Sequence, residues 1–143
     1  MKRKIEASIL IISLLMVMVS CAKESDVDSS DLPFFPQQKQ VPNAYMDALL
    51  VGKLVLMNGC LRVNTNEGTS PLIIWPYGFS LRENANTIEI LDGSGQLVVQ
   101  VGDDVRVGGG EIQGEHLKEY DGQLFPKECS GPYWLASNEI VRD

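Results

Sequence analysis

The chain has 143 residues, a formal net charge of −7 at pH 7, three cysteines and a single histidine. The acidic balance argues against nucleic-acid binding, because Lys and Arg side chains that neutralise phosphates supply most of that affinity. It also disfavours direct electrostatic attachment to anionic lipid, and its general consequence is solubility.

The first 21 residues have the three-part layout of a secretory signal. A basic cluster at residues 2–4 is followed by an apolar run from Ala7 to Val19, and then by Ser20 and Cys21. A basic end, an apolar centre and a small residue before a cut are typical of exported proteins. The apolar run is shorter than the roughly 20 residues that a transmembrane helix needs.

The residues Met18-Val19-Ser20-Cys21 resemble the lipobox of bacterial lipoproteins. The resemblance implies that the Cys21 sulfur receives a diacylglyceryl group and that residues 1–20 are removed just before it. Met18 stands where Leu is usual in that motif and has a similar volume. The alternative interpretation is an uncleaved single-pass anchor that carries a cysteine at its end.

Lipidation of Cys21 predicts an extracytoplasmic protein anchored to the cell membrane or to an outer membrane. Each buried CH₂ group contributes about 0.8 kcal/mol, and the several acyl chains of a lipoprotein hold more firmly than one. Ala22 follows the cysteine, and by the rule for enteric-type lipoproteins it permits sorting to an outer membrane. Removal of residues 1–20 takes away three basic residues and one acid, so the charge of −7 becomes −9 for the remainder.

The lipidated cysteine and a flexible tether are expected at residues 21–42, a stretch rich in Ser, Asp, Pro and Gln. Phe34 and Phe35 are the exception, and packing on the domain, contact with a partner and simple disorder all remain open for them. Residues 43–143 are then a single domain of roughly 100 residues, a size that holds one core but buries a modest fraction of its surface.

Two cysteines remain if Cys21 carries lipid. An even pair in an exported domain predicts a disulfide, here between Cys60 and Cys129. Cys129 lies in a loop-like stretch, residues 126–132, which a bond to a core strand would hold in place. Two free thiols or a metal site are the alternatives, but the chain has no Cys-x-x-Cys spacing and His116 is not near either cysteine in sequence.

The apolar pattern of the domain has the period of short strands. Asn58-Gly59 is a strong hairpin signal, and Gly108-Gly109-Gly110 indicates a sharp bend or bulge at a barrel corner. The chain therefore predicts an all-β fold, a small antiparallel barrel or sandwich of about seven strands, with little helix beyond a short one at residues 115–120. The expected strands are residues 53–57, 60–64, 72–75, 87–91, 97–101, 104–107, 133–135 and 139–141.

The segments GCLRV, PLIIWPYGFSL, ILDGSGQLVVQVGDDVRVGGGEI and CSGPYW resemble those of uncharacterised small bacterial lipoproteins. The resemblance covers nearly all of residues 50–141. It implies a compact β-barrel of OB-like type with a cysteine pair, and it carries over no catalytic residue.

Four aromatic residues form the candidate ligand-binding set: Trp75, Tyr77, Tyr133 and Trp134. If exposed, they would stack on a sugar ring or a peptide; if buried, they would fill the core. The pattern favours burial for Trp75 and for Phe79 and leaves Tyr77 open. Tyr133 and Trp134 would join the same cluster if the disulfide draws them near.

Residue types that commonly act in catalysis or metal binding are few in this sequence. His116 lies in a polar segment, and no nucleophile elbow surrounds a serine. Asp103 and Asp104 follow Gly102, where turn formation accounts for them, and no calcium-loop motif is present. The sequence thus predicts no cofactor, no metal and no catalytic set. It favours a lipid-anchored, non-catalytic binding or structural module with a protein or small-molecule ligand. The alternative is an envelope hydrolase, which needs carboxylates such as Asp104, Glu111 and Glu115 to converge in a cleft.

Overall fold

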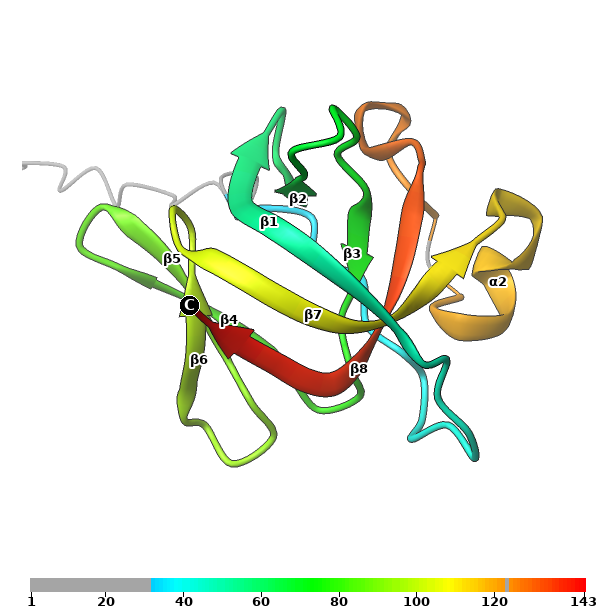
Figure 1. The fold of residues 1–143 in the computed structure, drawn as a ribbon. Helices are drawn as coiled ribbons and strands as arrows, with labels where there is room; N and C mark the ends of the chain where they lie inside the picture. The colour runs from blue at the N-terminus through cyan, green and yellow to red at the C-terminus, as the bar shows by residue number, and fades with distance from the viewer. Residues whose placement is uncertain (1–31, 123) are drawn as a thin grey trace, which may run out of the picture. The chain divides into compact units, whose positions relative to one another are not determined.

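Strands dominate residues 32–122 and 124–143, the parts of the chain that this computed structural model describes (Figure 1). Residues 32–143 form one compact unit. The strands are β1 (Ala48–Met57), β2 (Cys60–Asn64), β3 (Leu72–Ile74), β4 (Ser80–Asn84), β5 (Thr87–Leu91), β6 (Leu97–Gln100), β7 (Asp104–Ile112) and β8 (Tyr133–Arg142). The short helices are η1 (Gly114–His116), α2 (Leu117–Tyr120) and η2 (Lys127–Cys129).

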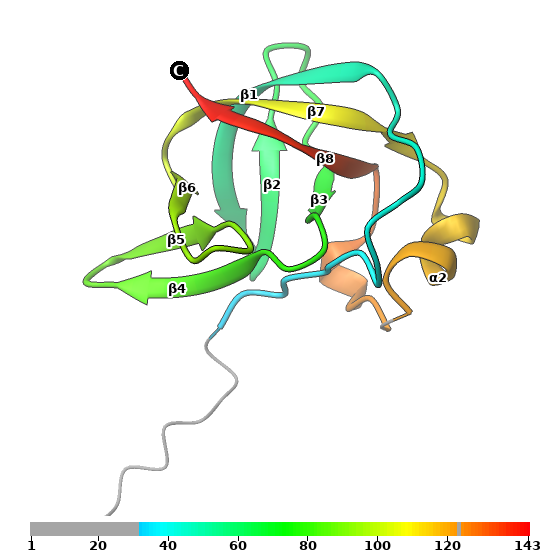
Figure 2. The same cartoon turned by 90° about the horizontal axis from the view of Figure 1, so that it is seen from below.

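The all-β prediction is confirmed, but the barrel contains five strands rather than seven. Strands β1, β2, β3, β8 and β7 close the barrel in that order, while β4, β5 and β6 form a separate three-stranded sheet that extends to one side (Figure 2). The period of two that identifies a strand does not identify its partners, because side chains alternate in the same way in both sheets.

One strand pair departs from the predicted antiparallel arrangement. β3 pairs with β8 in parallel, with Leu72 opposite Tyr133 and Ile74 opposite Leu135, whereas the other barrel pairs are antiparallel. Parallel neighbours need a long connection, and the chain between these two strands contains the whole three-stranded sheet and strand β7.

Two turn predictions are confirmed. Asn58 and Gly59 both have positive φ, 51° and 77°, and join β1 to β2 as a two-residue hairpin. The register between β7 and β8 shifts between Val107 and Gly109, which places a bulge within the glycine run. A Cβ atom on Gly109, whose φ is 141°, would overlap the carbonyl oxygen of Leu135.

The barrel interior is filled by large side chains. Ile73 lies on β3 and Trp75 comes just after it, and both side chains point into the barrel. Both are fully buried, together with Leu54, Leu61 and Val63. The alternate residues Leu72 and Ile74 point outward and belong to two further buried clusters. Those clusters lie beneath the connection that contains α2 and η2, so this connection covers the outer side of β3 and β8.

Residues 32–40 also pack on the barrel, although the sequence placed them in a tether that ends at residue 42. Phe34 forms a bridge to Cys60 and Gln37 forms one to Trp75. Gln38 is buried, and its Nε2 donates to the carbonyl oxygen of Ala136 at 2.6 Å. The barrel thus provides hydrogen-bond partners for polar groups of this segment and packing partners for its apolar side chains. The compact unit begins at Leu32 rather than at residue 43.

The predicted disulfide is confirmed. Cys60 begins β2, Cys129 ends η2, and their Cα atoms are 5.5 Å apart. Both residues are buried with Leu72, and Phe34 and Phe125 pack against them. The bond fixes the connection before β8 to the outer side of β2.

Candidate functional site

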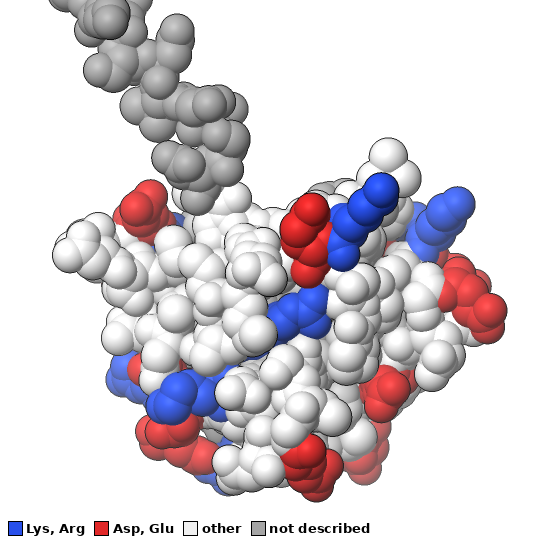
Figure 3. Space-filling model, turned by 90° about the horizontal axis from the view of Figure 1, so that it is seen from above, with Lys and Arg blue, Asp and Glu red and all other residues white. Residues whose placement is uncertain are grey.

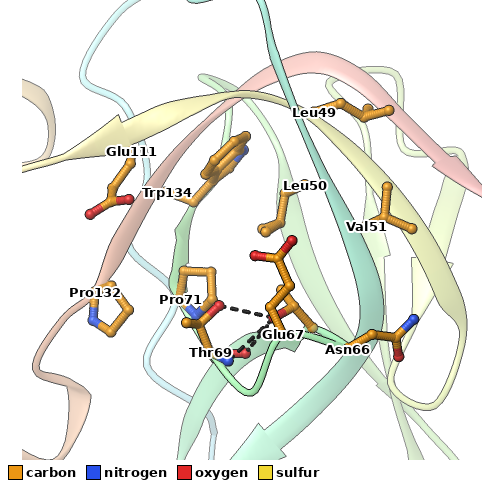
Figure 4. Close-up of a pocket in the computed structure, with 11 residues that line it drawn as sticks. Leu49, Leu50, Val51, Asn66, Glu67, Thr69, Pro71, Glu111, Pro132 and Trp134 are labelled. Atoms are coloured by element: carbon orange, nitrogen blue, oxygen red, sulfur yellow. Dashed lines mark hydrogen bonds between the residues drawn. The ribbon is translucent and has the colours of Figure 1, made fainter.

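A cavity of about 510 Å³ lies at one end of the barrel (Figure 4). It opens where β1 and β8 begin, where β7 ends and where the loop between β2 and β3 crosses the end of the barrel. Its lining residues are Leu49, Leu50, Val51, Thr65, Asn66, Glu67, Thr69, Pro71, Glu111, Pro132 and Trp134.

Strand alternation explains the floor of this cavity. Leu50 and Trp134 belong to the barrel core and are 8% and 9% exposed, which leaves each a small accessible area toward the opening. Glu111 is the register partner of Trp134. Partners in an antiparallel pair project from the same face, so Glu111 projects on the core side at the barrel end.

The loop at the rim is held by its own hydrogen bonds. The backbone N–H of Thr65 donates to the carbonyl oxygen of Thr69 at 2.9 Å, and the two threonine hydroxyl oxygens are also 2.9 Å apart. Gly68, with a φ of 82°, permits the tight reversal. This turn carries Glu67, whose carboxylate points toward Leu50, with Glu111 across the cavity on β7 (Figure 4).

The charged residues that line the cavity are all negative. Glu67 and Glu111 are the charged lining residues, and Lys, Arg and His are absent from the lining. Among the ion pairs of the described residues, none involves either carboxylate. The cavity therefore combines an apolar floor with two exposed carboxylates that have no cationic partner within the described part of the chain.

The four aromatic residues of the predicted ligand-binding set do not form one exposed face. Trp75 is fully buried and stacks on Phe35, with ring centroids 5.4 Å apart. Tyr133 packs beside the disulfide in an outer cluster, and Tyr77 is 55% exposed on the turn after Trp75. Of the four residues, Trp134 alone lines the cavity described above.

A second hollow, of about 460 Å³, lies beside the disulfide and contains Arg62. The Arg62 guanidinium is buried and donates to the carbonyl oxygens of Ser70 and Ser130, at 2.8 and 2.5 Å. Burial lowers the pKa of Arg62 below its ordinary value. The guanidinium thereby holds the loop between β2 and β3 against the segment that precedes β8.

The three carboxylates that the sequence suggested for a hydrolase, Asp104, Glu111 and Glu115, lie apart. Asp104 forms an ion pair with Lys53 at 2.9 Å, and Glu115 lies on η1 with its Oε1 3.5 Å from the exposed His116. Glu111 shares its cavity with Glu67 and with neither of the other two acids. Within residues 32–122 and 124–143, no group of three or more His, Cys, Asp or Glu residues is arranged to hold a metal ion.

Sequence reasoning missed Glu67. Glu67 lies in a polar stretch between two expected strands, and the place of this stretch over the open end of the barrel depends on which strands close the barrel. The sequence grouped Glu111 with Asp104 and Glu115, whereas the structure places it in one cavity with Glu67.

Cys21 and the signal-like segment lie outside the described residues. In the described part of the chain, no helix has the length and apolar character to cross a membrane. Comparison with protein families, with curated proteins and with solved structures finds no match to this chain.

Proposed function

We propose that the chain is an exported bacterial lipoprotein whose barrel is a non-catalytic binding or structural module of the cell envelope. The observation that carries the proposal is the buried disulfide between Cys60 and Cys129. Disulfides form and persist in oxidising compartments outside the cytoplasm. The bond uses two of the three cysteines and leaves Cys21, at the end of the apolar run, as the residue for lipid.

We also propose that the barrel is OB-like. Its order, β1-β2-β3-β8-β7, with a single parallel pair between β3 and β8, fits a five-stranded Greek-key barrel. Such barrels bind oligonucleotides or oligosaccharides on the side of their second and third strands. Here the connection before β8 and residues 34–38 cover that side. Binding at the open end of the barrel is therefore more consistent with this chain.

The charges favour a partner other than nucleic acid. Basic and acidic side chains alternate on the face shown in Figure 3, without a continuous basic tract on that face. Lys53, Arg106 and Arg82 are each paired with a carboxylate, which reduces what they can offer to phosphates. The acidic net charge adds to this preference.

Palmitate labelling tests the lipoprotein proposal. The full chain, expressed in a bacterial host, should incorporate labelled palmitate, fractionate with membranes and lose residues 1–20. Cys21→Ala should abolish the label. The double variant Cys60→Ala/Cys129→Ala is the matched control and should keep the label, because those cysteines are not the acylated residue. Equal labelling of the wild type and Cys21→Ala, or an unlabelled wild type, would contradict the proposal.

A hydrolase remains the alternative because Glu67 and Glu111 line one cavity. A screen of cell-wall glycans, peptides and esters with the full chain distinguishes the two functions. Turnover that Glu111→Gln abolishes would replace the binding proposal with catalysis. Lack of turnover, together with saturable binding of one of these compounds, would support a binding module.

A further inference from the structure

We propose that the open end of the barrel binds a basic side chain, lysine or arginine, of a peptide or protein partner. The cation would lie between the carboxylates of Glu67 and Glu111, and its aliphatic stem would lie on Leu50 and Trp134. This inference rests on the proposed binding role and specifies the ligand of that module.

The cavity is large enough to admit a long side chain together with part of the peptide that carries it. Its volume of about 510 Å³ lies within the usual range for ligand sites, and barrel mouths are among the places where such sites occur. Leu50 and Trp134 make the floor apolar, while Pro71 and Pro132 add rigid walls beside it. Lysine and arginine bury an aliphatic stem along apolar surface and keep the charged head at a polar edge.

The negative charge of the cavity favours a positively charged ligand. Some carboxylates of the domain have basic partners: Asp104 pairs with Lys53, and Asp143 pairs with Arg106 at 2.7 Å. Glu67 and Glu111 have none among the described residues, although they share a cavity with apolar walls. A cation that enters this cavity would meet two carboxylates and no competing positive charge.

A peptide is favoured over a free metal ion by the rest of the lining. The described residues contain no cluster of three metal-ligating side chains, whereas exposed Leu49 and Val51 lie beside the cavity on β1. Hydroxyl and amide groups of Thr65, Asn66 and Thr69 line the other side. Apolar residues next to polar hydrogen-bonding groups suit the backbone and neighbouring side chains of a peptide.

Calorimetric titration of the full chain, purified in a neutral detergent, tests the inference. The probe is the peptide acetyl-Ala-Lys-Ala-Lys-Ala-amide, with an arginine version as a second arm and a glutamine version as the uncharged control. We expect the glutamine peptide to bind at least about tenfold more weakly. We also expect high salt to weaken the binding of the charged peptides, because the carboxylates are exposed.

Three variants localise the binding. Glu67→Gln and Glu111→Gln should each lower the affinity for the lysine peptide about fivefold, and the double variant should lower it about 20-fold. These magnitudes are those of partly exposed ion pairs. Glu83→Gln is the matched control because Glu83 is an exposed acid on β4, outside the cavity, and this variant should bind like the wild type. Unchanged urea midpoints would show that all four proteins are folded.

Three outcomes would overturn the inference. They are equal affinity for the glutamine peptide, equal weakening of binding by Glu83→Gln and Glu67→Gln, and tight binding of Ca²⁺ that the lysine peptide does not displace. Palmitate labelling of the same variants separates this test from the proposed function. If labelling is intact while lysine binding is absent, the ligand assignment fails and the lipoprotein proposal stands.

Discussion

Arg62 illustrates how one residue of this domain joins parts that are distant in sequence. Its side chain projects from β2 and is only 8% exposed. It donates to Ser70 on one side and to Glu128 and Ser130 on the other. The planar guanidinium has several donors in fixed directions, so one side chain satisfies carbonyl groups of two separate loops.

Replacement of Arg62 by lysine should keep the charge but lose this geometry. A single ammonium group cannot reach both loops, and buried carbonyl oxygens lose their donors. We expect Arg62→Lys to lower the free energy of unfolding by about 2–3 kcal/mol. Urea denaturation at pH 7 measures the change. The control is Arg142→Lys at a half-exposed site, which should cost less than about 0.5 kcal/mol. A loss in Arg62→Lys no larger than in this control would contradict the interpretation.

Gly109 is a second residue whose identity the backbone dictates. Its φ of 141° is open to glycine, and an added Cβ would overlap the carbonyl oxygen of Leu135. Gly109→Ala should therefore lower the free energy of unfolding by more than about 3 kcal/mol, through backbone strain together with steric overlap. Gly95→Ala is the matched comparison. Gly95 has a φ of 81°, and no atom lies within 4 Å of an added Cβ. Backbone strain alone should therefore lower the free energy of unfolding of this variant by about 1 kcal/mol. Equal losses in the two variants would show that the overlap is relieved.

At the scale of elements, the hairpin of β4 and β5 contains a nearly buried carboxylate. Glu89 accepts from Arg82 Nε and from Asn84 Nδ2, both at 2.8 Å. The hydrogen bond from Asn84, followed by that from Arg82, lowers the pKa of Glu89 below its usual value of 4.5. A carboxyl group whose pKa is lower in the folded state stabilises that state above its unfolded pKa and loses the contribution as the pH falls.

Acid should therefore destabilise the domain in part through Glu89. Between pH 6 and pH 3 the melting temperature of the wild type should fall, and the fall should be smaller in Glu89→Gln. The melting temperature of Glu89→Gln should still depend on pH to some extent, because hydrogen bonds from Ser94 and from the Gln96 backbone also lower the pKa of Asp92. Thermal melts at several pH values provide the measurement. Parallel curves for wild type and variant would contradict a role for Glu89.

The elements were the most predictable level of this fold. Alternating apolar residues and the Asn58-Gly59 turn predicted most strands and the first hairpin. Strand β4 was missed because its sequence, SLREN, is polar and its side chains are mostly exposed. β8 was predicted in two pieces because Ser137 and Asn138 interrupt the apolar pattern within one continuous strand.

At the scale of the whole molecule, long-range pairing decides both the barrel and its cavity. The parallel pair of β3 and β8 joins residues that no local pattern relates. This pairing brings Pro71 and Pro132 to the same end of the barrel, with Glu67 above them on the loop. Glu111 was recognisable as an acid near a strand end, but its position opposite Glu67 follows only from the closed barrel.

The disulfide acts at this same scale. It joins residues 69 apart in sequence, and both of its cysteines are buried under Phe34 and Phe125. In the chain-entropy description, closing a loop of this length stabilises the fold by about 4 kcal/mol through its restriction of the unfolded state. The bond also holds the connection that covers the outer side of β2, because η2 ends at Cys129.

Cys60→Ala/Cys129→Ala should therefore lower the free energy of unfolding by about 4 kcal/mol in urea, with alanine chosen because both sites are buried. Hydrogen exchange should increase most in residues 113–122 and 124–132, since β1 and β7 keep their strand pairing without the bond. Reduced wild type should behave like the double variant, and Cys21→Ala should keep full stability. A double variant as stable as the oxidised wild type would show that packing around Leu72, and not the covalent link, holds this connection on the barrel.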